Sequence, residues 1–349
     1  MKNKTLQIWW VDDEAERLRS RAIKRIQEGG GASVKARWRA KVWLLCLKDQ
    51  TGRIEFEKEM DRAKRNKKLP HLIVLDQNLN IADGLRGSSF AVSIRAEIPS
   101  VPIVGVTAVE LEKIADLQRE QFIELFSLDG LQSGDRIPDL FSIATGFAKV
   151  ASSYRRTTNP SERTGQILQW LDCPKDDSDF LSKCLPGEFI DEWDDETGHS
   201  FARWVWHTFA GRPGFLSDDL EIATVLGLKE SGLMRLETKL NGCDYRGVFS
   251  SSARRRWWVS KVRRAVRELT KASATEPLWK LGRQLIGDQY VRDFSRCHGR
   301  SPKGCVPDVV AFSDDTLRDP IQARMQDTKP LDTDTPPFGF EQRRVFWKG

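Results

Sequence analysis

The sequence contains no hydrophobic run long enough to cross a membrane, which takes about 20 consecutive apolar residues. Its first residues, MKNKTLQIWWVDDE, also lack the apolar core of a secretion signal. We therefore expect a soluble, cytoplasmic protein that makes no membrane contact. The 6 cysteines among the 349 residues lie at scattered positions without paired spacing, which predicts reduced thiols rather than disulfide bonds.

Signatures of several enzyme classes are missing as well. The sequence has no glycine-rich phosphate loop, no HExxH zinc motif and no nucleophile elbow. Cys297, His298 and Cys305 do not have the spacing of zinc ligands, and no fourth ligand is evident. The acidic residues between Glu192 and His199 are more typical of an exposed face than of a hydrolase site. We therefore do not expect the chain to be an enzyme.

The length of the chain fits two domains, and 39% hydrophobic residues are enough for a substantial core. Residues 151–165, ASSYRRTTNPSERTG, are polar and have no apolar period, so we interpret them as a linker. This linker separates a first domain at 1–150 from a second domain at 166–349. The pattern of the second domain is mainly helical, with a few short strands towards its end.

Strand and helix patterns alternate along the first domain. Helical periodicity separates apolar runs that are typical of buried strands, at 6–11, 72–75, 101–106 and 123–126. This alternation predicts an α/β fold built on a doubly wound parallel sheet. Ligands of such sheets bind beyond the carboxyl ends of the strands.

Three of these strands end on residues suited to phosphoryl chemistry. Asp12 and Asp13 follow the first strand, Asp76 ends the run LIVLD, and Thr107 follows VPIVGV. Clustered carboxylates repel one another unless a cation or a proton intervenes, and Mg²⁺ suits such a cluster because it takes oxygen ligands. With Mg²⁺ bound, an aspartate can attack a phosphoryl donor, and a threonine hydroxyl can bond a phosphate oxygen.

Residues 5–150 resemble the receiver domain of two-component response regulators, which has a flavodoxin-like fold. The resemblance rests on the acidic pair in WVDDE, on Asp76 in LIVLDQNLN and on Thr107 with Ala108 in VPIVGVTA. It implies that Asp76 is the phosphoacceptor and that Thr107 bonds the phosphoryl group.

The same resemblance implies the other members of the site. Asp13 would be a direct ligand of Mg²⁺, and Asp12 would support the ion through water. Asp76 would be a further ligand, and the backbone carbonyl of Asn78 would complete the ligands from the protein. Phe126 falls where the family often has a switch aromatic.

A response regulator implies a sensor histidine kinase as the source of the phosphoryl group. The added charge would reorganise the face around Thr107 and Phe126 and alter its contact with the second domain or with an effector protein. Many receivers pair through their last helix and strand, so a homodimer is compatible with the resemblance. The unfamiliar second domain suggests a specialised bacterial phosphorelay, such as one in phage defence.

The sequence departs from the receiver pattern in two ways. The family carries a lysine after its last strand, but FIELFSLDGL contains none, and an ungapped count from Thr107 places Asp129 there. The interval between Asp13 and Asp76 is also longer than usual, which predicts an insertion around 38–68. The alternative is therefore a pseudoreceiver, which keeps the fold as a protein-binding module without phosphorylation.

The most concentrated basic charge lies in the second half, in SSSARRRWWVSKVRRAVRELTKA. Helical spacing places Trp258, Val262 and Val266 on one apolar face, so the segment predicts an amphipathic basic helix. Three interpretations remain open. The helix contacts nucleic acid, as in a DNA-binding transcriptional regulator that uses 254–267; it docks on an acidic partner; or it is a solvated basic face. The candidate contact residues are Arg254, Arg255, Arg256, Arg263 and Arg264.

Overall fold

The computed structural model describes nine ranges of the chain. These are residues 5–13, 20–29, 39–47, 50–79, 86–212, 214–250, 255–291, 309–313 and 316–323. Among the residues singled out above, Arg254, Cys297, His298 and Cys305 lie outside these ranges.

The chain forms two compact units. The first comprises Met1–Leu171, Leu185–Trp206 and Gly247–Arg254, and the second comprises Asp172–Cys184, His207–Arg246 and Arg255–Gly349. This division differs from the expected boundaries at 150 and 166, because helices from beyond residue 150 pack into the first unit.

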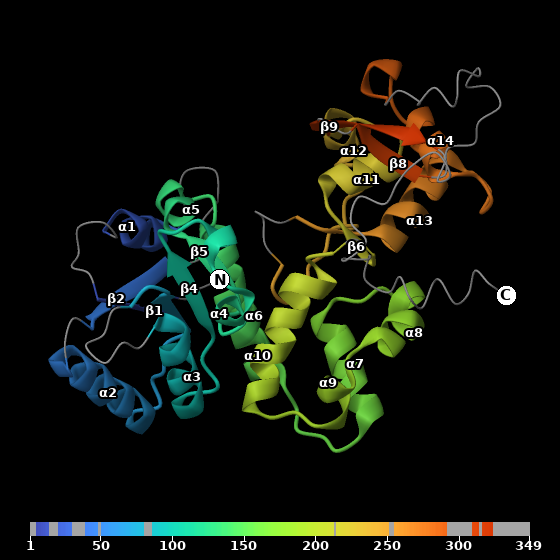
Figure 1. Cartoon of the computed structure of the whole chain (residues 1–349). Helices are drawn as coiled ribbons and strands as arrows, with labels where there is room; N and C mark the ends of the chain where they lie inside the picture. The colour runs from blue at the N-terminus through green and yellow to red at the C-terminus, as the bar shows by residue number, and fades with distance from the viewer. Residues whose placement is uncertain are drawn as a thin grey trace. The chain divides into compact units, whose positions relative to one another are not determined.

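A five-stranded parallel sheet lies at the centre of the first unit (Figure 1). Its strand order is β2-β1-β3-β4-β5, and every neighbouring pair is parallel. This confirms the prediction of a doubly wound α/β fold. The strands are β1 (Thr5–Asp12), β2 (Arg39–Cys46), β3 (Leu72–Asp76), β4 (Ile103–Thr107) and β5 (Leu125–Ser127).

Every residue of β3 and β4 is buried, which explains their continuous apolar sequences, because helices cover both faces of a parallel sheet. The helices that follow the strands are α1 (Ser20–Glu28), α2 (Gln50–Arg65), α3 (Gly87–Glu97), α4 (Asp116–Arg119), α5 (Leu128–Ser133) and α6 (Ile137–Ser153). The segment expected as an insertion contains β2 and α2, which are regular elements of the fold.

An aromatic cluster fills the space between the sheet and two of its helices. Trp9 of β1 meets Phe56 of α2 with ring centroids 6.1 Å apart, and Phe56 meets Phe90 of α3 at 5.2 Å. Ile73 and Leu75 of β3 complete this core, and both are fully buried. Burying each such side chain contributes roughly 1.5–3 kcal/mol.

The segment expected as a linker is partly helical. Helix α6 ends at Ser153, and α7 (Pro160–Trp170) begins only a few residues later. The Asn159 side chain accepts a hydrogen bond from the backbone N–H of Ser161 at 2.9 Å, and Pro160 occupies the first helical position. Residues that resemble a linker in composition therefore begin a helix here.

Two further helices of the first unit, α9 (Gly187–Asp191) and α10 (Asp195–Arg203), pack against α7 and α6. Trp170, Trp193 and Phe201 meet one another at centroid distances of 5.2–5.7 Å. These aromatic residues therefore form a core rather than an exposed binding platform.

Polar contacts connect helix α10 and the residues that follow it to the segments that precede β4 and β5. The Nε2 of His199 lies 2.9 Å from the carbonyl oxygen of Val101, and the indole N–H of Trp206 donates to Glu124 at 2.6 Å. Arg203 donates to the carbonyl of Glu120. Just beyond, η2 (Trp204–Phe209) is a π-helix, a form that often occurs at functional sites.

The second unit is mainly helical with a few short strands, as predicted. Two strand pairs, β6 with β7 and β8 with β9, are antiparallel. None of the described helices is long and apolar enough to span a bilayer. The elements are α8 (Lys175–Cys184), β6 (Leu216–Ser217), α11 (Asp219–Val225), α12 (Glu230–Leu236), β7 (Trp257–Trp258), α13 (Val259–Thr270), α14 (Leu278–Gln284), η3 (Asp288–Tyr290), β8 (Val309–Ser313) and β9 (Thr316–Ala323).

Candidate metal centre

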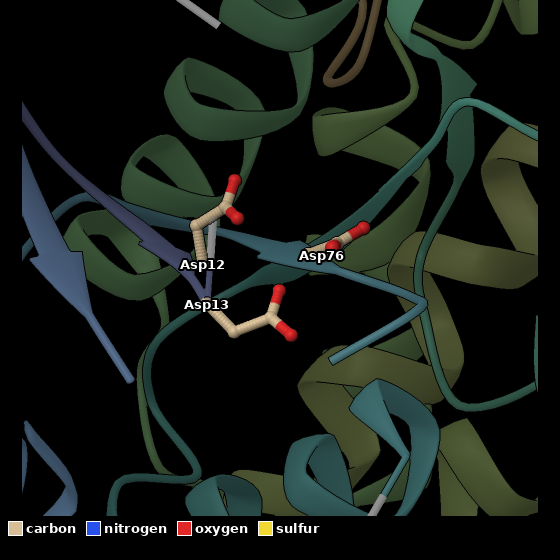
Figure 2. A group of neighbouring side chains, drawn as sticks. All are labelled: Asp12, Asp13 and Asp76. Atoms are coloured by element: carbon tan, nitrogen blue, oxygen red, sulfur yellow. The ribbon is translucent and has the colours of Figure 1, made fainter. Parts of the chain in front are cut away.

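Two neighbouring strands bring the three predicted aspartates together. Asp12 is the last residue of β1 and Asp13 follows it, while Asp76 is the last residue of β3. Val11 pairs with Leu75 in the parallel register, so the acids emerge side by side at one edge of the sheet. Each offers one carboxylate oxygen, and these three atoms lie within 4.8 Å of one another (Figure 2).

The carboxylates lie in a mostly buried environment. Asp12 is 0% exposed and Asp76 is 2% exposed, while Asp13 is half-buried. The indole N–H of Trp10 donates to Asp12 Oδ2 at 3.0 Å, and the backbone N–H of Asn78 donates to Asp76 Oδ1 at 3.3 Å. Holding three like charges this close is unfavourable unless a cation or a proton offsets them.

This group of oxygen ligands fits a small, hard divalent cation. Mg²⁺ is bound by carboxylates and keeps several of its waters, so two or three protein oxygens are enough ligands to hold it. Asp13 is the least buried of the three. The backbone carbonyl of Asn78 as a ligand stays a prediction.

The neighbouring strand places Thr107 beside the aspartates. Asp76 pairs with Val106 of β4, and Thr107 is the next residue and the last of that strand. Thr107 is 1% exposed, and its Oγ1 accepts the backbone N–H of Val109 at 3.0 Å. The hydroxyl proton remains able to donate to a group bound near Asp76.

Asp129 lies after β5, as the ungapped count places it, but it is two residues beyond the end of the strand. The register pairs Thr107 with Ser127, which is the last residue of β5. Helix α5 begins directly afterwards, and the Ser127 side chain caps it by accepting the N–H of Gly130 at 3.2 Å. Asp129 is exposed in the first turn of that helix. The strand-end position is therefore neutral, neither basic nor acidic.

The predicted switch aromatic lies inside the first unit. Phe126 is 1% exposed, and the Arg136 guanidinium carbon lies 5.3 Å from its ring centroid. Arg136 forms ion pairs with Asp139 at 2.8 Å and with Glu124 at 3.6 Å. Glu124 also accepts the indole N–H of Trp206, so polar contacts connect Phe126 to η2, the π-helix that follows α10. A switching role for Phe126 stays a prediction.

The structure adds a pocket that the sequence did not indicate. It has a volume of about 420 Å³ and is lined by residues just beyond the ends of β3 and β4. Two cations, Arg86 and Lys113, belong to this lining. The full lining is Gln77, Asn78, Leu79, Arg86, Val109, Lys113, Ile114 and Gln118.

Gly87 allows the start of α3 to lie against the end of β3. A Cβ added at Gly87 would lie 2.0 Å from the carbonyl oxygen of Asp76, so only glycine allows the start of α3 to approach the end of β3 this closely. The approach brings Arg86, the residue before Gly87, to the edge of the site. In the sequence, the signal that could have indicated Arg86 is a basic residue immediately before the glycine that begins α3.

The segment predicted as a basic helix over 254–267 is only partly helical, because Trp257 and Trp258 form strand β7 and helix α13 begins at Val259, in the second unit. Several of its arginines have acceptors in the same unit. Arg255 pairs with Glu237 at 2.7 Å and stacks over Trp257, Arg256 donates to the carbonyl of Ala210 at 2.5 Å, and Arg264 pairs with Asp176. A contact of Arg255, Arg256, Arg263 or Arg264 with nucleic acid or with a partner stays a prediction.

No family model matches the chain, and no curated protein matches it. Among solved structures, the chain is similar to the RcsB response regulator of Salmonella typhimurium, with 13% identity and a TM-score of 0.30, over 58% of this chain and 99% of that one. It is also similar to RcsB of Salmonella enterica serovar Typhimurium bound to promoter P1flhDC in the presence of phosphomimetic BeF3-, with 11% identity and a TM-score of 0.26, over 56% and 98% of the two chains. These scores are too low to assign a fold or a function, so the fold rests on the order and register of the strands.

Proposed function

We propose that the chain is a response regulator that accepts a phosphoryl group on Asp76 with the help of Mg²⁺. The observation that supports this most strongly is the cluster of Asp12, Asp13 and Asp76 within 4.8 Å, with Thr107 on the next strand. A sensor histidine kinase is the donor that this chemistry calls for.

Each residue has a defined part in the transfer. Asp12 and Asp13 hold Mg²⁺, which supplies positive charge that neutralises the phosphoryl oxygens. A carboxylate oxygen of Asp76 attacks phosphorus, and the P–N bond to the donor histidine breaks as its electron pair returns to the imidazole. The Thr107 hydroxyl donates to one phosphoryl oxygen. The N–H of Asn78, which donates to Asp76 Oδ1 at 3.3 Å, orients the attacking group.

The signal leaves the site through the side of the sheet that carries β4 and β5. Movement of Thr107 towards a phosphoryl group changes the environment of Phe126, which lies on the adjacent strand. Phe126 contacts Arg136, Arg136 pairs with Glu124, and Glu124 holds Trp206. We therefore expect η2, and an effector that binds there, to respond to the phosphorylated state.

The direct test is incubation with Mg²⁺ and a small phosphodonor, acetyl phosphate or phosphoramidate, followed by intact-mass measurement. The wild type is expected to gain one phosphoryl group, and Asp76→Asn is expected to gain none. Asp129→Asn serves as the matched control, because Asp129 is an exposed carboxylate outside the cluster. Equal labelling of the wild type and Asp76→Asn contradicts the proposal.

A pseudoreceiver is the second candidate, and Ser127 favours it. The residue opposite Thr107 at the end of β5 carries no charge, so it cannot pair with a phosphoryl group as a lysine does. If wild-type protein with a correctly folded sheet takes no label from either donor, the first unit acts as a protein-binding module without phosphoryl chemistry.

A further inference from the structure

Phosphorylation of Asp76, on which this inference rests, creates an excess of negative charge. The phosphoryl group of the resulting acyl phosphate carries a charge of about −1.5 to −2 at pH 7, and Asp12 and Asp13 remain beside it. One Mg²⁺ offsets only part of this charge, and Ser127 contributes none at the end of β5. Another cation is therefore needed close to the strand ends.

The pocket of about 420 Å³ lies next to the site. Asn78 and Val109 both line it, and each is directly connected to the site: Asn78 donates to the Asp76 carboxylate, and Val109 donates to the Thr107 hydroxyl oxygen. The pocket thus begins one residue beyond the phosphoacceptor, at Gln77, and two residues beyond the hydroxyl, at Val109.

Two cations in the lining can supply the missing charge. Arg86 is exposed and has no ion-pair partner among the residues that the structure describes. Lys113 pairs with Glu110 at 2.9 Å, but these side chains are 66% and 69% exposed. An exposed pair of this kind contributes little to stability, so Lys113 can leave it for a more highly charged partner.

A buried amide adds a third group that points to a ligand. Gln77 is 4% exposed, its Nε2 donates to Gln118 Oε1 at 3.0 Å, and its own Oε1 is buried without a hydrogen bond. Rotating both amides by half a turn keeps one hydrogen bond between them and presents the Gln77 NH₂ as an unused donor instead. The pocket can therefore offer an amide donor together with two cations, which suits an anion.

We propose that Arg86 and Lys113, with the Gln77 amide, bind the phosphoryl group on Asp76 in place of the lysine that is absent after β5. Arg86 is the main contributor, because its position is set by the contact of Gly87 with the Asp76 carbonyl. Its guanidinium can bind two phosphoryl oxygens at once, whereas the ammonium of Lys113 acts as a point charge.

Equilibrium binding of beryllofluoride in the presence of Mg²⁺ tests this, because it needs no turnover. Titrations followed by ¹⁹F NMR or calorimetry compare the wild type with Arg86→Ala, Lys113→Ala, the double variant and Arg86→Lys. The double variant is expected to bind beryllofluoride about tenfold or more weakly, with Mg²⁺ affinity unchanged. Arg86→Lys is expected to bind beryllofluoride more weakly than the wild type but more tightly than Arg86→Ala, because a single ammonium replaces the bidentate guanidinium. Lys149→Ala, which changes an exposed lysine outside the pocket lining, is the matched control.

The outcomes separate the two proposals. If the wild type binds beryllofluoride and the double variant binds it equally well, this inference is overturned and the phosphoacceptor role of Asp76 stands. If Mg²⁺ affinity falls together with beryllofluoride affinity, the cations act on the metal centre as a whole, which also overturns the inference. If the wild type binds Mg²⁺ but no beryllofluoride, both proposals fail.

Discussion

The two most highly charged regions of this protein are built in opposite ways. At the ends of β1 and β3, the backbone holds three carboxylates within 4.8 Å of one another. Around α13, cations face acids of the same unit, as with Arg264 and Asp176 or Lys261 and Asp172. The first region concentrates charge of one sign, whereas in the second region positive and negative charges neutralise one another.

This difference separates a site from a structural surface. Like charges that are held together raise the free energy of the folded state, so they persist where a ligand or a reaction repays the cost. Opposite charges on the surface contribute little but require no ligand. A count of charged residues alone points most strongly to the arginines of α13, whereas the sign and spacing of the charges point to the aspartates.

His199 is a third kind of ionisable group, a buried base that stays neutral in the folded protein. Its titration is expected to have the largest of the predicted effects on the free energy of unfolding. The pKa of His199 is lowered from 6.5 to about 4, mainly by burial; the hydrogen bond to Val101 opposes this shift, and the charges of Arg95 and Arg203 add to it. As pH falls below 6.5 the unfolded chain takes up a proton that the folded state refuses. The free energy of unfolding is therefore expected to fall by about 3 kcal/mol between pH 6.5 and pH 4.

Urea unfolding at several pH values measures this effect. In His199→Gln the amide can still donate to the Val101 carbonyl but does not titrate, so the pH dependence in this window is expected to flatten. A wild type and variant with the same pH dependence would show that His199 is not the group responsible.

The carboxylate cluster is tested next. Asp13→Asn is expected to weaken Mg²⁺ binding roughly a hundredfold, or about 2.7 kcal/mol, because it removes a charged oxygen ligand. Without metal, the same change is expected to stabilise the fold by up to about 1 kcal/mol, because two carboxylates repel each other less than three. Calorimetry and urea unfolding measure the two quantities. A variant that loses affinity and apo stability together would argue against a repulsive cluster.

Within the basic region, Arg256 is expected to matter most. It is the more buried partner of its ion pair with Asp218, being 18% exposed, and it donates to the Ala210 carbonyl. Arg256→Ala is expected to destabilise the protein by about 1.5 kcal/mol, because the carbonyl loses its donor. Urea unfolding measures it, and an effect below that of the exposed Arg264→Ala would contradict this reasoning.

The smallest stability effect belongs to Arg264→Ala. Arg264 and Asp176 are 50% and 57% exposed, so breaking their pair is expected to cost about 0.5 kcal/mol or less. A gel shift with duplex DNA provides the functional counterpart. If the protein binds DNA in a salt-dependent way, and joint replacement of Arg255, Arg256 and Arg264 with alanine weakens this binding, then α13 is a nucleic-acid surface. The contrast between the aspartate cluster as a site and α13 as a structural surface would then be wrong.

The sequence predicted those parts of the site that depend on local patterns. Asp12, Asp13, Asp76 and Thr107 each end an apolar run, and parallel strands place such ends at one edge. The position of Ser127 at the end of β5 was not predicted, because an ungapped count does not show that β5 has only three residues and that α5 follows it directly.

Features that depend on long-range packing were not accessible from local patterns. Arg86 precedes α3 and Lys113 ends the 3-10 helix η1 (Leu111–Lys113), and only the folded chain places them around one pocket. The division of the chain was also predicted incompletely, because the burial of Trp170 and Phe201 against each other joins α7 and α10 to the first unit. Composition indicated a linker at 151–165, whereas aromatic packing places the helices after it in the first unit.

The hydrogen bond from Trp10 to Asp12 gives the protein an intrinsic optical reporter. Trp10 is fully buried, and its indole N–H lies 3.0 Å from a carboxylate oxygen at the cluster. Emission from an indole responds to charge on its hydrogen-bond acceptor, so withdrawal of that carboxylate by a cation would alter the fluorescence of this one ring. Trp10→Phe would isolate its signal from that of the other tryptophans, and occupancy could then be followed in the unlabelled protein.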